Sequence, residues 1–300
     1  MVKNYGIDLA REQSEQSPED WQFGALSLPS LINIPQGERE NFLPQGEVQR
    51  GREDFVDCAS RAPVNKLEAD FTYGYQNKRF KPENLKWLED NGYVQDGRIL
   101  FSDRFIAIKS KTTRQGNSMK APLDAINNSG LIPKSLLPKL PDMTFDEYHD
   151  STSITKEMED LGKEFLKRWD INYEKVYAVH SGELLKEDML CAAGYAWPTP
   201  INGEYPKPES FLSPNHEFLK FALPKTFIFD NYEESPNDFI KKLVPDYTFY
   251  DYDYRVFISG EYTPEERSIQ LSVFQVLLQY GLLAFFADFW EKFNKAIGKR

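Results

Sequence analysis

The sequence predicts an α+β protein of two lobes, with helices in the first lobe and antiparallel strands in the second. Apolar residues recur at steps of three and four through 58–76, which is a helical period. Short aromatic and β-branched runs between turn residues dominate from about residue 176 onward. A connector rich in proline and acidic residues, 138–155, separates the two patterns. We therefore expect a helical lobe over 46–140 and a β lobe over 141–260, preceded by an arm over 1–45 and followed by a helix within 261–300.

Composition limits the class of protein. With 300 residues, 40% of them apolar and 14% aromatic, the chain is long enough to bury a sizeable core. The net charge of −11 argues against a nucleic-acid partner, because such a protein normally carries a basic face. The two cysteines form no disulfide framework, and the N-terminus lacks the apolar core of a signal peptide. We expect a cytoplasmic protein, or a virion-associated one if it is viral.

The first 45 residues are rich in Gln, Glu, Pro and Gly, with breakers at Pro29, Pro35 and Pro44. This composition predicts an extended arm that packs through a few apolar residues.

Cys58 stands at the start of the helix predicted over 58–76. Unpaired backbone N–H groups and the positive end of the helix dipole favour a thiolate there, so the pKa of Cys58 should be low. Cys58 is therefore a candidate nucleophile, although a free cysteine is more often a small buried apolar residue. Arg61 and Lys66 indicate that one face of this helix meets solvent or an acidic partner.

Further helices are predicted near 82–89, 121–128 and 156–173, and strands near 176–179, 190–196 and 247–258. We interpret His149 as a surface residue of the connector, His180 as a structural residue in a loop, and Cys191 as an inert cysteine in a buried strand.

His216 and Asp230 belong to two aromatic strands joined by a turn at Pro224-Lys225. Strands linked in this way place Asp230 near the end of the sheet where His216 lies. A carboxylate there can hold one imidazole nitrogen while the other faces a thiol.

In this order, these residues resemble the papain-like cysteine peptidases. A polar lead-in precedes Cys58, Leu67-Glu68 follows nearly three turns later, and Asn215-His216 opens a strand, as in that family. The segment 114–118 occupies the place of the family's glycine-rich wall of the substrate cleft. A papain-like two-lobed fold is therefore expected.

The resemblance implies a Cys58 nucleophile, a His216 base, an orienting Asp230 shielded by Tyr232, and peptide hydrolysis through an acyl-enzyme. It also implies an oxyanion-hole amide from Gln49, although Gln49 lies nine residues before Cys58, farther than the family pattern. The implied substrate is a peptide or protein, with no cofactor and no metal. The arm over 1–45 could be a pro-segment, but family pro-regions are usually helical and longer, so we favour a structural arm.

The alternative is a catalytically inactive papain fold kept for assembly, for instance a phage virion component anchored by its C-terminal helix. Arg61, Lys66, the displaced Gln49, and Glu217 where the family prefers a small apolar residue favour that alternative.

The C-terminal segment 264–300 predicts a strongly apolar helix that begins after Thr263. A helix of this kind exposes more apolar surface than a soluble monomer tolerates, so we expect association with a protein partner or with itself. Packing against its own domain is a second interpretation. Gln270, Gln275 and Asp288 argue against membrane contact, since polar groups are costly in lipid.

Overall fold

The computed structural model describes residues 6–17, 29–45, 48–195, 200–207, 213–222, 226–231 and 239–279. The chain divides into two compact units, Met1–Glu261 and Tyr262–Arg300, which are described separately.

The first part of the larger unit is mainly helical. Its α-helices are α1 (Leu9–Ser14), α2 (Arg39–Phe42), α3 (Cys58–Gln76), α4 (Pro82–Asp90), α5 (Asp103–Lys109), α6 (Lys120–Ser129), α7 (Phe145–Tyr148) and α8 (Lys156–Leu166). The short strands β1 (Val94–Gln95) and β2 (Arg98–Ile99) form an antiparallel pair.

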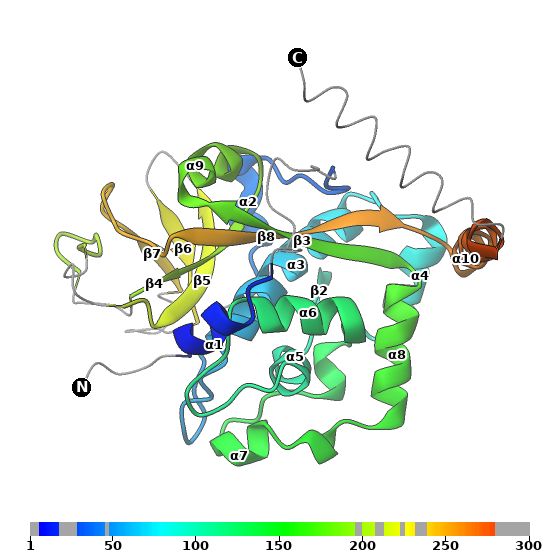
Figure 1. Ribbon diagram of the computed structural model, residues 1–300, viewed down its shortest axis with the longest axis horizontal. Coiled ribbons are helices and arrows are strands. Elements are labelled where there is room, and N and C mark those ends of the chain that lie inside the picture. Colours follow the sequence, from blue (N-terminus) through cyan, green and yellow to red (C-terminus); the bar gives the residue numbers. More distant parts are fainter. Residues whose placement is uncertain are drawn as a thin grey trace. The chain divides into compact units, whose positions relative to one another are not determined.

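The second part is an antiparallel sheet of six strands in the order β3-β8-β4-β5-β6-β7. The strands are β3 (Trp169–Tyr177), β4 (Leu190–Gly194), β5 (His216–Ala222), β6 (Phe227–Phe229), β7 (Ile240–Lys242) and β8 (Tyr252–Glu261). In Figure 1, α5, α6 and α8 lie below the long strands β3 and β8, whereas α9 (Ala178–Glu187) lies above them. The predicted α+β class, with a helical lobe before a β lobe, is confirmed.

Three local predictions near the start of the sheet were wrong. The strand expected near 176–179 ends at Tyr177, where β3 ends and α9 begins at Ala178. The helix expected over 156–173 ends at Leu166, and β3 begins at Trp169 because buried and half-buried side chains alternate over its first four residues. His180 lies exposed within α9 rather than in a loop. That helix forms because Leu184 and Leu185 pack with apolar side chains of β3 and β4.

Helix α3 is buried over nearly its full length, although we expected Arg61 and Lys66 on it to meet solvent or an acidic partner. Arg61 lies 3.0 Å from Asp57 and 2.7 Å from Asp103. Lys66 lies 2.8 Å from Asp188. Both cations are at most 1% exposed, so the expectation of a solvent-facing side was wrong. Buried charges of this kind persist because acids of the same chain neutralise them.

An aromatic cluster ties α3 to the start of the sheet. The Phe71 ring lies 5.3 Å from each of the rings of Phe101, Phe165 and Trp169, measured between ring centroids. Such contacts stabilise a core beyond their apolar area. They fix the axis of α3, and with it the position of Cys58 at its first residue.

The smaller unit contains α10 (Pro264–Gln279). The predicted start after Thr263 is confirmed, since Thr263 and Glu266 exchange hydrogen bonds of 2.7 and 3.2 Å across the first turn. Most of the apolar pattern expected for this helix falls on 280–300, outside the described residues, so its role in association stays a prediction. Among the helices that the structure describes, none is long and apolar enough to cross a membrane.

Candidate active site

The N-terminus of α3 meets the first residues of β5. The Sγ atom of Cys58 accepts a hydrogen bond from the backbone N–H of Glu217 at 3.4 Å. Glu217 follows His216 directly, so the predicted nucleophile lies beside the start of the strand that carries the predicted base.

His216 and Asp230 are hydrogen-bonded to each other. The His216 Nε2 atom lies 2.5 Å from Asp230 Oδ1, and both side chains are fully buried. The contact arises because β5 and β6 pair antiparallel, with Leu219 opposite Phe229, and Asp230 follows the end of β6. The ring atom Nδ1 therefore lies on the side of the imidazole away from Asp230.

A third buried charge, Lys241, completes this group. Its Nζ atom forms an ion pair with Asp230 Oδ2 at 3.0 Å. Burial alone would raise the pKa of Asp230, but the charges of His216 and Lys241 outweigh burial and lower that pKa to about 2. Sequence reasoning missed Lys241, because a lysine in a short strand gives no local signal of its partner.

The pKa of Cys58 moves opposite to our expectation. Burial raises it well above the ordinary value, and the nearby carboxyl of Glu217 raises it further. The backbone N–H of Glu217 opposes this increase but does not overcome it. The thiol is therefore protonated in this arrangement, because desolvation disfavours the thiolate more than the N–H bond favours it.

The cause of this burial includes the N-terminal residues 6–17, which we call the cover segment. Gly6 lies against Cys58, and a Cβ atom at Gly6 would sit 2.7 Å from Cys58 Sγ. The segment also pairs with the loop before α6: Asp8 N donates to Asn117 O at 2.8 Å, and Asn117 N donates to Gly6 O at 3.0 Å. The Cys58 side chain is consequently 1% exposed.

The buried carboxyl of Glu12 anchors the cover segment. Its Oε1 atom accepts hydrogen bonds from the hydroxyls of Tyr252 at 2.6 Å and Tyr254 at 3.2 Å, both on β8. Its Oε2 atom accepts from the backbone N–H of Lys120, the first residue of α6, at 3.2 Å. Figure 1 shows α1 beside α6, close to the sheet. Sequence reasoning missed Glu12, since nothing in a polar arm marks one acid as buried.

Gln49 is buried beside Asn231, the residue after Asp230, rather than in a loop that faces solvent. It is fully buried, and its backbone N–H donates to Asn231 O at 2.8 Å. Its side-chain amide donates to Asp54 Oδ1 at 3.4 Å. Its predicted part in an oxyanion hole stays a prediction.

The neighbouring Asn231 has a different contact from Asp230. Its Oδ1 atom accepts from Asn65 Nδ2 on α3 at 2.8 Å, whereas Asp230 contacts His216. The strand register therefore presents the carboxylate, and not the amide, to the imidazole. Tyr232, the predicted shield of that contact, lies outside the described residues.

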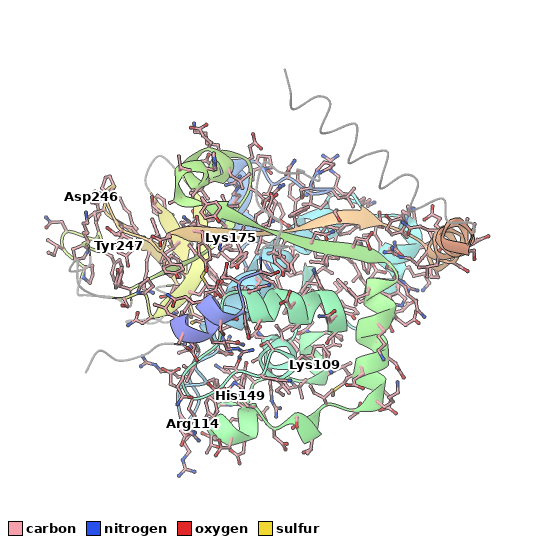
Figure 2. All side chains as sticks on the ribbon, viewed as in Figure 1. Lys109, Arg114, His149, Lys175, Asp246 and Tyr247 are labelled. Atoms are coloured by element: carbon pink, nitrogen blue, oxygen red, sulfur yellow. The ribbon has the colours of Figure 1, made fainter. Side chains whose placement is uncertain are left out.

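The other histidine and cysteine candidates lie elsewhere. The His149 ring stacks on Phe145 with centroids 4.1 Å apart, and burial lowers its pKa. Figure 2 shows His149 beside α7, far from Tyr247 in the β lobe. Cys191 is buried in β4, and burial raises its pKa well above the ordinary value. Over the ranges that the structure describes, no group of three or more His, Cys, Asp or Glu side chains could hold a metal ion.

No protein-family model matches the sequence, and the search of curated proteins gave no match. Solved structures do match. Xylellain, a cysteine protease from Xylella fastidiosa, is 13% identical with a TM-score of 0.53 over 85% of this chain and 95% of its own. The proform of the ragweed pollen cysteine protease Amb a 11 is 10% identical with a TM-score of 0.50 over 86% of this chain and 75% of its own. This chain therefore has the fold of the papain-like cysteine proteases.

Proposed function

We propose that the protein is a cysteine peptidase in which Cys58 is the nucleophile, His216 the general base and Asp230 the group that orients the imidazole. The observation that carries the proposal is the convergence of these residues from two lobes. Asp230 holds Nε2 of His216, and the residue after His216 donates its N–H to Cys58 Sγ. Nδ1 is then the ring nitrogen that would take the thiol proton.

In the proposed reaction, the Cys58 proton passes to His216 and the sulfur attacks a peptide carbonyl. The tetrahedral intermediate collapses to an acyl-enzyme, and His216 gives its proton to the departing amine. Water then loses a proton to neutral His216 and attacks the acyl carbon, which restores the thiol. Asp230 keeps one imidazole orientation through both steps.

The thiol must first be uncovered. With the cover segment in place, Cys58 is buried and its pKa is raised. Displacing the segment would admit water or substrate and remove part of the desolvation. The N–H of Glu217 and the N-terminus of α3 then favour the thiolate, and the carboxyls of Glu217, Asp57 and Asp54 oppose them.

We infer that a peptide substrate would take the place of the residues that precede α1. Two backbone hydrogen bonds, between Asn117 and the Gly6 and Asp8 positions, hold the residues that precede α1 beside Cys58. An extended peptide could make the same pair of bonds through its own main chain, whatever its side chains. We therefore propose peptides or unfolded protein segments as substrates.

The test is digestion of an unfolded protein substrate by the full chain carrying Glu12→Ala, which weakens the anchor of the cover segment. We expect cleavage that the added substitution Cys58→Ala abolishes. A matched control is Glu183→Ala in α9, whose side chain is 81% exposed. Cleavage that persists in the Cys58→Ala form would refute the proposed nucleophile.

A non-catalytic role is the second candidate. Glu217 favours it, because its buried carboxyl stands beside the thiol and burial raises its own pKa well above the ordinary value. A site evolved only for thiolate chemistry gains nothing from a carboxyl there. If the Glu12→Ala variant is folded, exposes Cys58 and still cleaves nothing, the non-catalytic role is the better account.

A further inference from the structure

Lys241 contacts Asp230, the residue that we propose orients the base His216. It lies at the centre of β7, opposite Ile228 of β6. Its Nζ atom is 3.0 Å from Asp230 Oδ2, and the other oxygen of Asp230 is 2.5 Å from His216 Nε2. All three side chains are fully buried. One carboxylate thus bridges an ammonium group and an imidazole in a site removed from water.

A buried carboxylate without a cation has two unfavourable outcomes. It can take up a proton, or it can stay charged and stabilise the imidazolium form of its neighbour. Either outcome would disturb a base that must gain and lose a proton within each cycle. With Lys241 present, the Asp230 and Lys241 side chains together carry no net charge, while Oδ1 still accepts a hydrogen bond from the ring.

Other titratable groups near these three side chains, among the residues that the structure describes, include Cys58 on α3, Glu217 directly after His216 on β5, Tyr247 in the loop before β8, and Tyr205, whose ring centroid lies 5.9 Å from Lys241 Nζ. Tyr247 is kept neutral because burial raises its pKa, and its hydroxyl donates to Tyr195 O at 3.0 Å. Neither this hydroxyl nor a protonated thiol can supply the positive charge that Lys241 gives to Asp230.

We propose that Lys241 is a positioning residue of the site: it keeps Asp230 ionised and oriented, and it cancels the carboxylate charge that His216 would otherwise sense. This inference rests on the proposed function for its catalytic meaning. Its physical content, the charge balance around His216, can be measured without turnover.

The test uses the ring-proton resonances of the full chain, which has three histidines. The His216 signal is assigned by its loss in His216→Gln, and its titration is followed in Lys241→Met. We expect the titration midpoint to rise by about one pH unit or more, because an uncompensated carboxylate favours the imidazolium. The matched control is Lys242→Met on the same strand, whose side chain is 26% exposed and pairs with Glu204. It should leave the midpoint unchanged.

A second variant keeps the test decisive if Lys241→Met does not fold. The double variant Asp230→Asn with Lys241→Met has no buried charge to balance, so it should fold and should not show the raised midpoint. In Lys241→Met, an unchanged midpoint with Asp230 still ionised, as read from its carboxyl carbon shift, would overturn the inference, whereas a protonated Asp230 would support it. A double variant that unfolds as readily as the single one would also overturn the inference, since charge balance would then not explain Lys241.

The outcomes also separate this inference from the proposed function. A raised midpoint in a protein that cleaves no peptide would support the role of Lys241 and refute the peptidase. Peptide cleavage by the wild-type site, with Asp230 still ionised and the His216 midpoint unmoved in Lys241→Met, would leave the peptidase standing and refute the role of Lys241.

Discussion

Replacing Glu12 with alanine should uncover Cys58. The substitution removes three hydrogen bonds that tie the cover segment to other elements, those from Tyr252, Tyr254 and the N–H of Lys120. At about 1 kcal/mol for each bond, the closed state loses about 3 kcal/mol relative to the open one. Since about 1.4 kcal/mol corresponds to a tenfold change in an equilibrium, the open population should rise roughly a hundredfold.

The assay is the rate at which a small thiol reagent modifies Cys58 in the native protein, followed by mass spectrometry of the peptides. Cys191 serves as an internal control, because it is fully buried in β4 and reacts only when the sheet opens. We expect faster modification of Cys58 with no change at Cys191. Equal acceleration at both cysteines would mean general destabilisation, and no acceleration at Cys58 would refute the anchoring role of Glu12.

Further predictions concern the cover segment, the proposed catalytic group and the buried charges. Gly6→Ala should also accelerate modification of Cys58, because its Cβ would lie 2.7 Å from Sγ. In the Glu12→Ala background, His216→Ala should abolish peptide cleavage, while Asp230→Ala should reduce the cleavage rate less, because Asp230 only orients the base. Lys66→Met should lower the free energy of unfolding in urea by about 3–5 kcal/mol, since it leaves buried carboxylates without their cation. The lowered pKa of Asp230 stabilises the fold above about pH 4, and this contribution is lost as the pH falls toward 2. The difference in unfolding free energy between wild type and Asp230→Asn should therefore shrink over that range by about 2 kcal/mol.

Local patterns were enough to predict the elements that carry the proposed chemistry. The helical period from Cys58 to Gln76 and the strand pair that holds His216 and Asp230 are set by residues close in sequence. The order of these elements also led to the correct fold class. Periodicity records which faces of an element are apolar, and that information lies within the element itself.

The features that sequence reasoning missed depend on contacts between distant parts of the chain. Arg61 and Lys66 looked like surface residues, because two of the acids that neutralise them, Asp103 and Asp188, lie on other elements. The low pKa expected for Cys58 followed from the helix N-terminus alone, and burial under the cover segment reversed it. Glu12 was missed for the same reason, since its hydrogen-bond partners come from α6 and β8.

The most direct test of the account is covalent capture by an epoxysuccinyl peptide, an electrophile that depends on an activated thiolate and a peptide-binding site. The full chain with Glu12→Ala should gain the mass of one inhibitor, and the adduct should map to Cys58. Adding His216→Ala should greatly reduce that adduct, while a small general thiol reagent at high concentration still reaches and modifies Cys58. An adduct that forms equally well without His216, or no adduct on a Cys58 that the general reagent reaches, would contradict the claim that Cys58 and His216 form a catalytic pair.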